Sequence, residues 1–323
     1  MRKSAIITGI YGQDGSLLAE RLLAQGWRVV GIVNKTKPEF RGIEDAEIIE
    51  ADISDLAAMR SVFKKIQPDE CYHLAAAHHS SEQITAADFR MQMLRVNFLA
   101  TQALIDTIVD YLPHCRFLYA GSSQMYTPGE GVTVVNEISP YRPSSYYGIT
   151  KVAGANLVSL MRRERKLWGL TAVLFNHESP RRRPEFLSRK VTMAAAQSRV
   201  NQDRNGLGLQ TKLELRDISA RVDWSAAVDI VKAMQMSLQV EQPQDYVLAS
   251  GQIHSVRELL DEAFNAVNVN WAGCVVAQES GLGRCLQGDS QRAHDVLGWR
   301  PQYSFPTLIQ EMVAHDLHTL SGT

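Results

Sequence analysis

Short apolar runs alternate with longer segments of helical periodicity through the first half of the chain. The runs predict strands over Ser4–Ile7, Arg28–Val33, Ala46–Glu50, Cys71–Leu74, Arg116–Ala120 and Thr171–Phe175. The periodic segments predict helices over Ser16–Gln25, Ala57–Lys65, Met93–Asp110 and Lys151–Leu167. Strands that alternate with helices form parallel sheets covered on both faces, so we expect a doubly wound α/β fold of the Rossmann type.

The pattern changes in the second half, where segments become shorter and are interrupted by charged residues, glycine and proline. Helical spacing returns at Val191–Ser198 and Val228–Leu238. We therefore expect residues 1–175 to form a dinucleotide-binding domain, to which residues 213–250 return. Residues 176–323 are expected to form mainly a smaller C-terminal α/β substrate-binding domain over the carboxyl edge of the sheet.

Composition narrows the class of protein. The chain has 323 residues, 45% hydrophobic and 21% charged, with a formal net charge of −1. This balance is typical of a soluble globular protein and argues against nucleic-acid binding. We find no signal peptide and no apolar run long enough to cross a membrane, so we expect a cytoplasmic protein. The cysteines match no metal signature and predict buried, reduced thiols at Cys71, Cys115, Cys274 and Cys285.

A glycine-rich turn joins the first predicted strand to the first helix and reads Thr8-Gly9-Ile10-Tyr11-Gly12-Gln13-Asp14-Gly15. Glycine allows a tight turn and a close approach of the backbone to a pyrophosphate, and the helix N-terminus presents free N–H groups to it. A purely structural turn is the alternative. The position directly after the first strand favours a dinucleotide site.

The end of the second strand bears on the choice between NAD and NADP. NAD-binding proteins usually place a carboxylate there, but this chain continues as Asn34-Lys35-Thr36-Lys37. Lys35 and Thr36 predict a site for the 2′-phosphate of NADP, although NAD is not excluded and a solvated basic loop is the alternative. Asp52 is placed to meet the adenine.

A Tyr-x-x-x-Lys spacing at Tyr147 and Lys151 places both side chains on one face of a helix. An ammonium near a phenol, together with a positive nicotinamide, favours the phenolate and is expected to lower the pKa of Tyr147. Tyr147 would then serve as an acid and base near neutral pH. Ser122, at the end of the fifth strand, is expected to hydrogen-bond a substrate oxygen beside it.

These motifs resemble the extended short-chain dehydrogenases that modify nucleotide sugars, and most closely the GDP-mannose 4,6-dehydratase family. The resemblance runs nearly end to end and includes His73-Leu74-Ala75-Ala76, Leu174-Phe175-Asn176-His177-Glu178-Ser179-Pro180, Phe186-Leu187-Ser188-Arg189-Lys190 and Val296-Leu297-Gly298-Trp299-Arg300-Pro301. It implies a nicotinamide site that includes Gly9, Tyr11, Gly12, Gln13, Asp14, Gly15, Ile53, Leu74, Ala75, Ala76, Asn176 and His177. It also implies a homodimer or homotetramer.

The resemblance implies a reaction cycle and also a departure from it. In the cycle, Tyr147 removes the proton of the sugar 4-hydroxyl while hydride leaves C4, a carboxylate then takes the C5 proton, and water leaves C6. Gln124 stands where the family has that glutamate, and an amide cannot act as a general base. We therefore expect elimination to be impaired unless another residue serves as base. Glu130 and Glu137 are candidates in the next loop.

The implied substrate is a nucleotide sugar, with a GDP-hexose expected. The residues implied to hold it are Ser123, Asn176, Arg182, Arg189, Lys190 and Arg221. Arg221 or Arg216 would compensate for a family arginine that is replaced here by Val222, and Arg284 lies near a second family segment, Arg-Pro-x-Glu, that is missing from Gln278–Gly288. The basic run Arg181-Arg182-Arg183 clamps phosphate, lines a neighbouring subunit or is a surface cluster. His78 and His79 follow the fourth strand near the expected nicotinamide and are candidates only.

Three functions remain open from the sequence. The first is a dehydratase-type enzyme with hydride transfer at the sugar C4. The second is a nucleotide-sugar 4-epimerase or 4-ketoreductase, which needs no C5 base. The third is a cofactor-binding protein with little catalysis, suggested by the missing base and arginine but opposed by the intact Tyr147 and Lys151.

Overall fold

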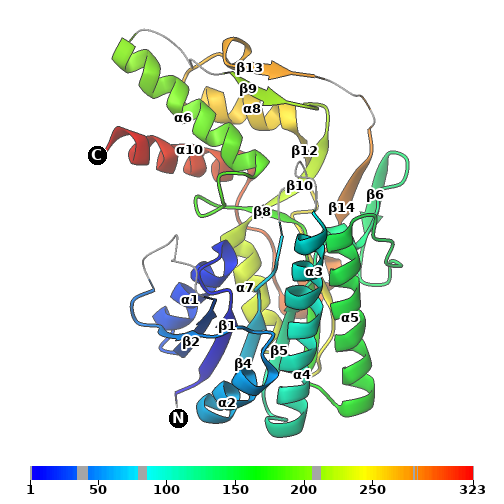
Figure 1. Ribbon diagram of the computed structural model, residues 1–323. Helices are drawn as coiled ribbons and strands as arrows, with labels where there is room; N and C mark the ends of the chain where they lie inside the picture. The colour runs from blue at the N-terminus through cyan, green and yellow to red at the C-terminus, as the bar shows by residue number, and fades with distance from the viewer. Residues whose placement is uncertain are drawn as a thin grey trace.

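The computed structural model describes residues 2–34, 43–78, 86–205, 212–278, 281 and 283–322. Its centre is a seven-stranded sheet (Figure 1). The strand order is β11 (Tyr246–Leu248), β7 (Gly169–Leu174), β5 (Arg116–Ala120), β4 (Glu70–His73), β1 (Ser4–Thr8), β2 (Arg28–Val33) and β3 (Glu47–Glu50). Every neighbouring pair is parallel, which confirms the predicted doubly wound α/β class.

Successive side chains of each strand enter two different cores. Ile6 packs on one face of the sheet, whereas its neighbours Ala5 and Ile7 pack on the other. The helices over the first face are α2 (Leu56–Ile66), α4 (Ala100–Tyr111) and α5 (Tyr146–Arg165). Those over the second face are α1 (Gln13–Ala24), α7 (Ala227–Ser237) and α9 (Gln291–Leu297). Because both faces are buried there, strands such as β1 and β7 are continuous apolar runs rather than alternating ones.

A smaller part of the molecule sits above the carboxyl ends of the strands (Figure 1). Its helices are α6 (Leu187–Asn205), α8 (Val256–Asn265) and α10 (Phe305–Ser321). Its strands form two small sheets, one of β12 (Ile253–Ser255), β10 (Arg221–Ala226) and β8 (Asn176–Glu178), the other of β13 (Val275–Ala277) and β9 (Leu213–Leu215). A third core joins these elements around Trp224, Leu260 and Phe305. Beside them, β6 (Val132–Val135) pairs in parallel with β14 (Cys285–Gly288).

Residues 213–250 contribute to both parts of the molecule. β9 pairs with β13 in the smaller part, whereas α7 and β11 pack with the main sheet. All four cysteines are free and buried, as predicted. Among the described residues, no helix combines the length and apolarity needed to cross a membrane.

The helix predicted over Lys151–Leu167 begins five residues earlier, since α5 starts at Tyr146. The reason is a cap that the apolar pattern does not reveal. The Ser145 hydroxyl accepts a hydrogen bond from the Gly148 N–H at 3.0 Å and so satisfies a donor of the first turn. The earlier start places Tyr147 on the helix itself rather than on the loop before it.

Asp223, on β10, joins the smaller part to the chain segments at Ser250 and Gly288. Its carboxylate is 1% exposed and accepts backbone N–H groups of Ser250 at 3.0 Å, Gly251 at 3.1 Å and Gly288 at 3.0 Å. The Ser250 hydroxyl donates a further hydrogen bond. Burial raises the pKa of Asp223 even though these hydrogen bonds oppose the shift.

Replacing Asp223 by alanine leaves three N–H groups without their acceptor, that of Gly288 buried and those of Ser250 and Gly251 part-buried. We expect Asp223→Ala to lower the free energy of unfolding by on the order of 3 kcal/mol. Urea unfolding measures the change, with Asp45→Ala in an exposed turn as the control. Equal stability of the two variants would show that Asp223 does not hold this junction.

Candidate active site

A cavity of about 890 Å³ lies at the carboxyl ends of the sheet strands. It is lined by segments that follow β1, β2, β3, β4, β5 and β7, together with α5 and the start of α6. The predicted residues that line it are Gly9, Tyr11, Gly12, Gln13, Asp14, Gly15, Asp52, Ile53, Leu74, Ala75, Ala76, Ser122, Ser123, Gln124, Tyr147, Lys151, Asn176, His177 and Arg182. One cavity therefore gathers residues that lie far apart in the sequence.

The glycine turn lies at one side of the cavity and fits a dinucleotide. Gly9 has φ +73°, and a Cβ there would lie 2.9 Å from the Cα of Ala75. A Cβ at Gly15 would overlap the carbonyl oxygen of Gly9. Gly12 caps α1 without a side-chain hydrogen bond, so the N–H groups of the first turn stay available to a ligand. This is the cradle that a pyrophosphate requires.

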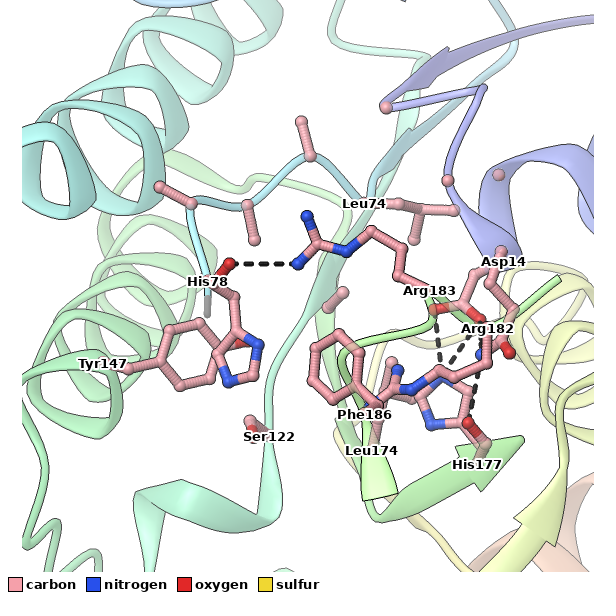
Figure 2. Close-up of a pocket in the computed structure, with 18 of the residues that line it drawn as sticks. Asp14, Leu74, His78, Ser122, Tyr147, Leu174, His177, Arg182, Arg183 and Phe186 are labelled. Carbon is pink, nitrogen blue, oxygen red and sulfur yellow. Dashed lines mark hydrogen bonds and ion pairs between the residues drawn. The ribbon is translucent and has the colours of Figure 1, made fainter. Parts of the chain in front are cut away.

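A buried ion pair between Asp14 and His177 lies beside this turn (Figure 2). The Nε2 of His177 is 2.9 Å from both carboxylate oxygens of Asp14, and its Nδ1 is 2.7 Å from the carbonyl oxygen of Phe175. Because both neighbours are acceptors, the ring carries a proton on each nitrogen. Burial opposes that charge, but the Asp14 carboxylate outweighs it and raises the pKa of His177.

Tyr147, Lys151 and Ser122 lie together at the opposite side (Figure 2 labels Tyr147 and Ser122). Lys151 is 2% exposed, and its ammonium donates to the carbonyl oxygen of Ala120 at 2.8 Å. Burial lowers the pKa of Lys151 to about 7. Burial also raises the pKa of Tyr147 and outweighs the opposing effects of Arg182 and of a hydrogen bond with Ser122.

The expected lowering of the Tyr147 pKa is therefore not met in the protein alone. The Lys151 ammonium lies 5.6 Å from the centre of the phenol ring, and burial of the phenol dominates. Burial raises the pKa of Tyr147, whereas a nearby positive charge lowers it. Stabilising the phenolate would therefore need further positive charge inside the cavity.

Gln124 lies in contact with the start of α5. A Cβ at Gly148 would overlap the carbonyl oxygen of Gln124, so only glycine allows the helix to approach this closely. The side-chain Oε1 of Gln124 accepts the Ser145 hydroxyl at 3.0 Å. Its Nε2 lies 3.4 Å from the Nε2 of His78. The amide is therefore held between α5 and the segment after β4.

Asn97 is a buried polar residue beside the cavity lining that the sequence reasoning missed. The predicted helix over Met93–Asp110 is in fact α3 (Ala87–Leu94), a π-helical turn over Arg95–Leu99 and then α4. From this turn, the fully buried Asn97 bonds the N–H of Ala77 at 2.8 Å, its carbonyl at 3.1 Å and the Thr150 hydroxyl at 3.1 Å. The signal available in the sequence was a polar residue on the apolar face of the predicted helix. In the structure this residue lies in a π-helical turn, and such turns often mark functional sites.

The turn between β8 and α6 supplies further lining residues, among them Phe186, which was not a predicted site residue. The guanidinium of Arg183 donates to the carbonyl oxygen of His78 at 3.2 Å, and the ring of Phe186 stacks on the His78 ring (Figure 2). Arg182 lies over Phe186 with its guanidinium carbon 3.9 Å from the ring centre. Part of the predicted basic run therefore faces the cavity.

Three predicted substrate residues are not among the described lining residues: Arg189, Lys190 and Arg221. Arg189 is 8% exposed, pairs with Asp316 of α10 and donates to the Arg182 carbonyl at 3.1 Å. Its contacts thus tie α6 to α10 and to the turn at Arg182. The predicted cofactor residues Lys35 and Thr36, and the candidate His79, lie outside the described residues. No group of three metal-ligand side chains is found within the described ranges.

Comparisons with known proteins agree with this geometry. The family model described as GDP-mannose 4,6 dehydratase matches residues 6–312. GDP-mannose 4,6 dehydratase 2 of Arabidopsis thaliana is 35% identical over 98% of this chain and 87% of its own length. dTDP-glucose 4,6-dehydratase of Bacillus anthracis, solved with NAD, has a TM-score of 0.81 at 16% identity, covering 97% of this chain and 96% of that one. RMD of Pseudomonas aeruginosa, solved with NADPH, has a TM-score of 0.78 at 21% identity, covering 98% and 99%.

The parallel sheet, the glycine cradle and the Tyr147–Lys151 helix define an enzyme of the short-chain dehydrogenase type. Within that class, the chain belongs to the GDP-mannose 4,6-dehydratase family. The family resemblance drawn from the motifs is thereby confirmed.

The buried Lys151 should make stability depend on pH. Its folded pKa of about 7 lies below the usual value of 10.5, so a charged lysine destabilises the fold at and below pH 7. As pH rises from there toward the unfolded pKa, the native protein binds fewer protons than the unfolded chain and becomes more stable. We expect Lys151→Met to raise the melting temperature most at neutral pH and less at higher pH.

Thermal unfolding of both proteins across that range measures the effect. Lys190→Met, in α6 outside the cavity lining, is the control. The gain in melting temperature from Lys151→Met should shrink as pH rises. A gain that stays constant would contradict the view that the buried ammonium destabilises the fold.

Proposed function

We propose that the chain modifies a nucleotide sugar, with a GDP-hexose as substrate, by hydride transfer at the sugar C4. The observation that carries this proposal is the meeting of Tyr147, Lys151 and Ser122 with the glycine cradle in one cavity. The family supports the choice of substrate, because its members are named for GDP-mannose. The reaction type is that of the GDP-mannose 4,6-dehydratases.

The cofactor site would be formed by the glycine turn, by Asp52 and Ile53 at the end of β3, and by Leu74, Ala75 and Ala76 after β4. When bound, the nicotinamide would accept hydride from the sugar and later return it. Asp14 and His177 would fix the cavity wall beside the cradle. Lys151 would donate to the nicotinamide ribose from its place below Tyr147.

Proton transfer would belong to Tyr147. Its phenol would take the proton of the 4-hydroxyl as hydride leaves C4, and Ser122 would hydrogen-bond the same oxygen. Burial raises the pKa of this phenol in the protein alone, so the phenolate requires positive charge nearby. Protonated Lys151 and the oxidised nicotinamide ring would provide it.

Asn176, Arg182 and Ser123 line the cavity and would contact the sugar and diphosphate. We also propose that the substrate contacts Arg189, Lys190 and Arg221. These side chains do not line the cavity, so such contacts require them to move when the substrate binds. Arg216 and Arg284 are exposed alternatives to Arg221 as a phosphate partner. We further propose a cytoplasmic homodimer or homotetramer, in line with the family resemblance.

Tyr147→Phe tests the proposed hydride chemistry. Incubation with GDP-mannose and oxidised cofactor should give cofactor reduction or a mass change in the sugar, and the variant should lose roughly a hundredfold or more of the rate. Tyr146→Phe, one residue away and outside the cavity lining, should retain activity. Turnover that survives in Tyr147→Phe would refute the assignment.

A second candidate function is a 4-epimerase or 4-ketoreductase. Gln124 favours it, because those reactions need no base at C5 and an amide cannot serve as one. The two functions differ in product. Epimerisation and ketone reduction keep the 6-hydroxyl, whereas the dehydratase reaction removes one water, which mass spectrometry of the sugar nucleotide detects.

We propose NADP as the cofactor. β2 ends at Val33 and continues with Asn34, so the described wall of the cavity has no carboxylate there to hold a ribose diol. We expect the dissociation constant for NADP to be at least about tenfold lower than for NAD, as one charge-assisted bond can provide. Titration with each nucleotide measures this. Lys35→Glu should reverse the preference, and tighter binding of NAD by the unaltered protein would contradict it.

A further inference from the structure

The dehydratase reaction needs a base for the sugar C5 proton, and the carboxylates available do not provide one. Glu137 accepts the Val247 N–H at 2.8 Å and pairs with Arg292, and neither it nor Glu130 is among the described lining residues. The lining carboxylates have partners of their own: Asp14 with His177, Asp52 with Arg95, Glu178 with Arg182 and Glu185 with Arg183. A base must therefore be sought among other side chains.

His78 lies in the cavity lining beside Tyr147 and Gln124. Its ring centre is 4.2 Å from that of Tyr147, and its Nε2 is 3.4 Å from the amide of Gln124. Of the described lining residues, it is the titratable side chain for which contacts with both Tyr147 and Gln124 are resolved. The imidazole thus stands next to the residue that replaces the family's glutamate.

The hydrogen-bond polarity around Gln124 fixes the state of the imidazole. Because the Ser145 hydroxyl accepts the Gly148 N–H, its own proton is donated to Oε1 of Gln124. The Nε2 of Gln124 is then a donor, and the Nε2 of His78 must be the acceptor. That ring nitrogen is unprotonated, as a general base must be; its lone pair accepts the Gln124 N–H here and would accept the C5 proton once the sugar displaces that hydrogen bond.

His78 is also held firmly in place. Asn97 bonds both backbone groups of the preceding Ala77, and Arg183 donates to the carbonyl oxygen of His78 itself. The Phe186 ring lies parallel to the imidazole, with 5.7 Å between ring centres and 5° between planes (Figure 2). Such positioning restricts the ring to one orientation in the cavity wall.

We infer that His78 is the base that removes the C5 proton of the sugar, in place of the family's glutamate. This inference rests on the proposed function, which first generates the C4 ketone. The C5–H bond next to that ketone breaks, and its electron pair forms the C5–C6 double bond as the C6–O bond breaks. The imidazolium returns its proton to the departing hydroxyl, so water leaves and atoms and charge balance.

The test uses the full-length protein with NADP and GDP-mannose in deuterium oxide. Wild-type protein should release water from the sugar and introduce solvent deuterium at C5, seen by mass spectrometry and NMR. His78→Asn should lose roughly a hundredfold or more of both signals. It should still reduce bound cofactor in a single turnover at a rate within about tenfold of wild type.

Controls separate this inference from the proposed function and from misfolding. His114→Asn, at an exposed turn, is the matched control. Titration of His78→Asn and His78→Gln with NADP shows whether each variant still binds the cofactor. Adding Gln124→Glu to His78→Asn should recover at least about tenfold of the lost dehydration, because a carboxylate is then restored beside C5.

Each other outcome is decisive. Wild-type protein that reduces cofactor without losing water or exchanging C5 would refute the role of His78 while leaving C4 chemistry intact. Full dehydration by His78→Asn would do the same. Loss of cofactor reduction in His78→Asn, with binding retained, would make His78 a positioning residue and overturn its role as base. Absence of hydride transfer in wild type would refute the proposed function itself.

Discussion

The close approach of α5 to the backbone of Gln124 is the constraint on which the site depends. Gly148 permits it, because any Cβ there would overlap the Gln124 carbonyl oxygen. This contact places Tyr147 beside the end of β5, where Ser122 lies, and it aligns Lys151 with the carbonyl of Ala120. Proximity of the reacting groups is thus built into packing between a helix and a strand end rather than into a loop.

Burial gives the cavity its chemical character, at a cost in stability. The pKa of Lys151 falls to about 7 because its ammonium is enclosed, and the pKa of the Tyr147 phenol rises for the same reason. An added positive charge would favour the Tyr147 phenolate but would disfavour the protonated form of Lys151. The Asp14–His177 pair is the opposite case, in which each charge is satisfied by its neighbour before any ligand arrives.

The sequence predicted the main sheet because its signals are local. Strands β1, β2 and β5, the glycine turn and the Tyr147–Lys151 spacing all appear in continuous motifs. Contacts formed between distant segments were not predictable in this way. The addition of β11 to the sheet, the burial of Arg189 against Asp316 and the π-helical placement of Asn97 each depend on partners far away in the chain. The same holds for the choice of His78 over the two loop glutamates.

The hydrogen-bonded series from Ser145 through Gln124 to His78 has a consequence for the evolution of this chain. A carboxylate at position 124 would accept from Ser145 and could not donate to the imidazole, so it would favour a protonated and therefore non-basic His78. The two positions are thus coupled, and their effects on activity should not add. A lineage that moves between a glutamate and a histidine as base must pass either through an intermediate that holds both groups, which interfere with each other, or through one that holds neither base.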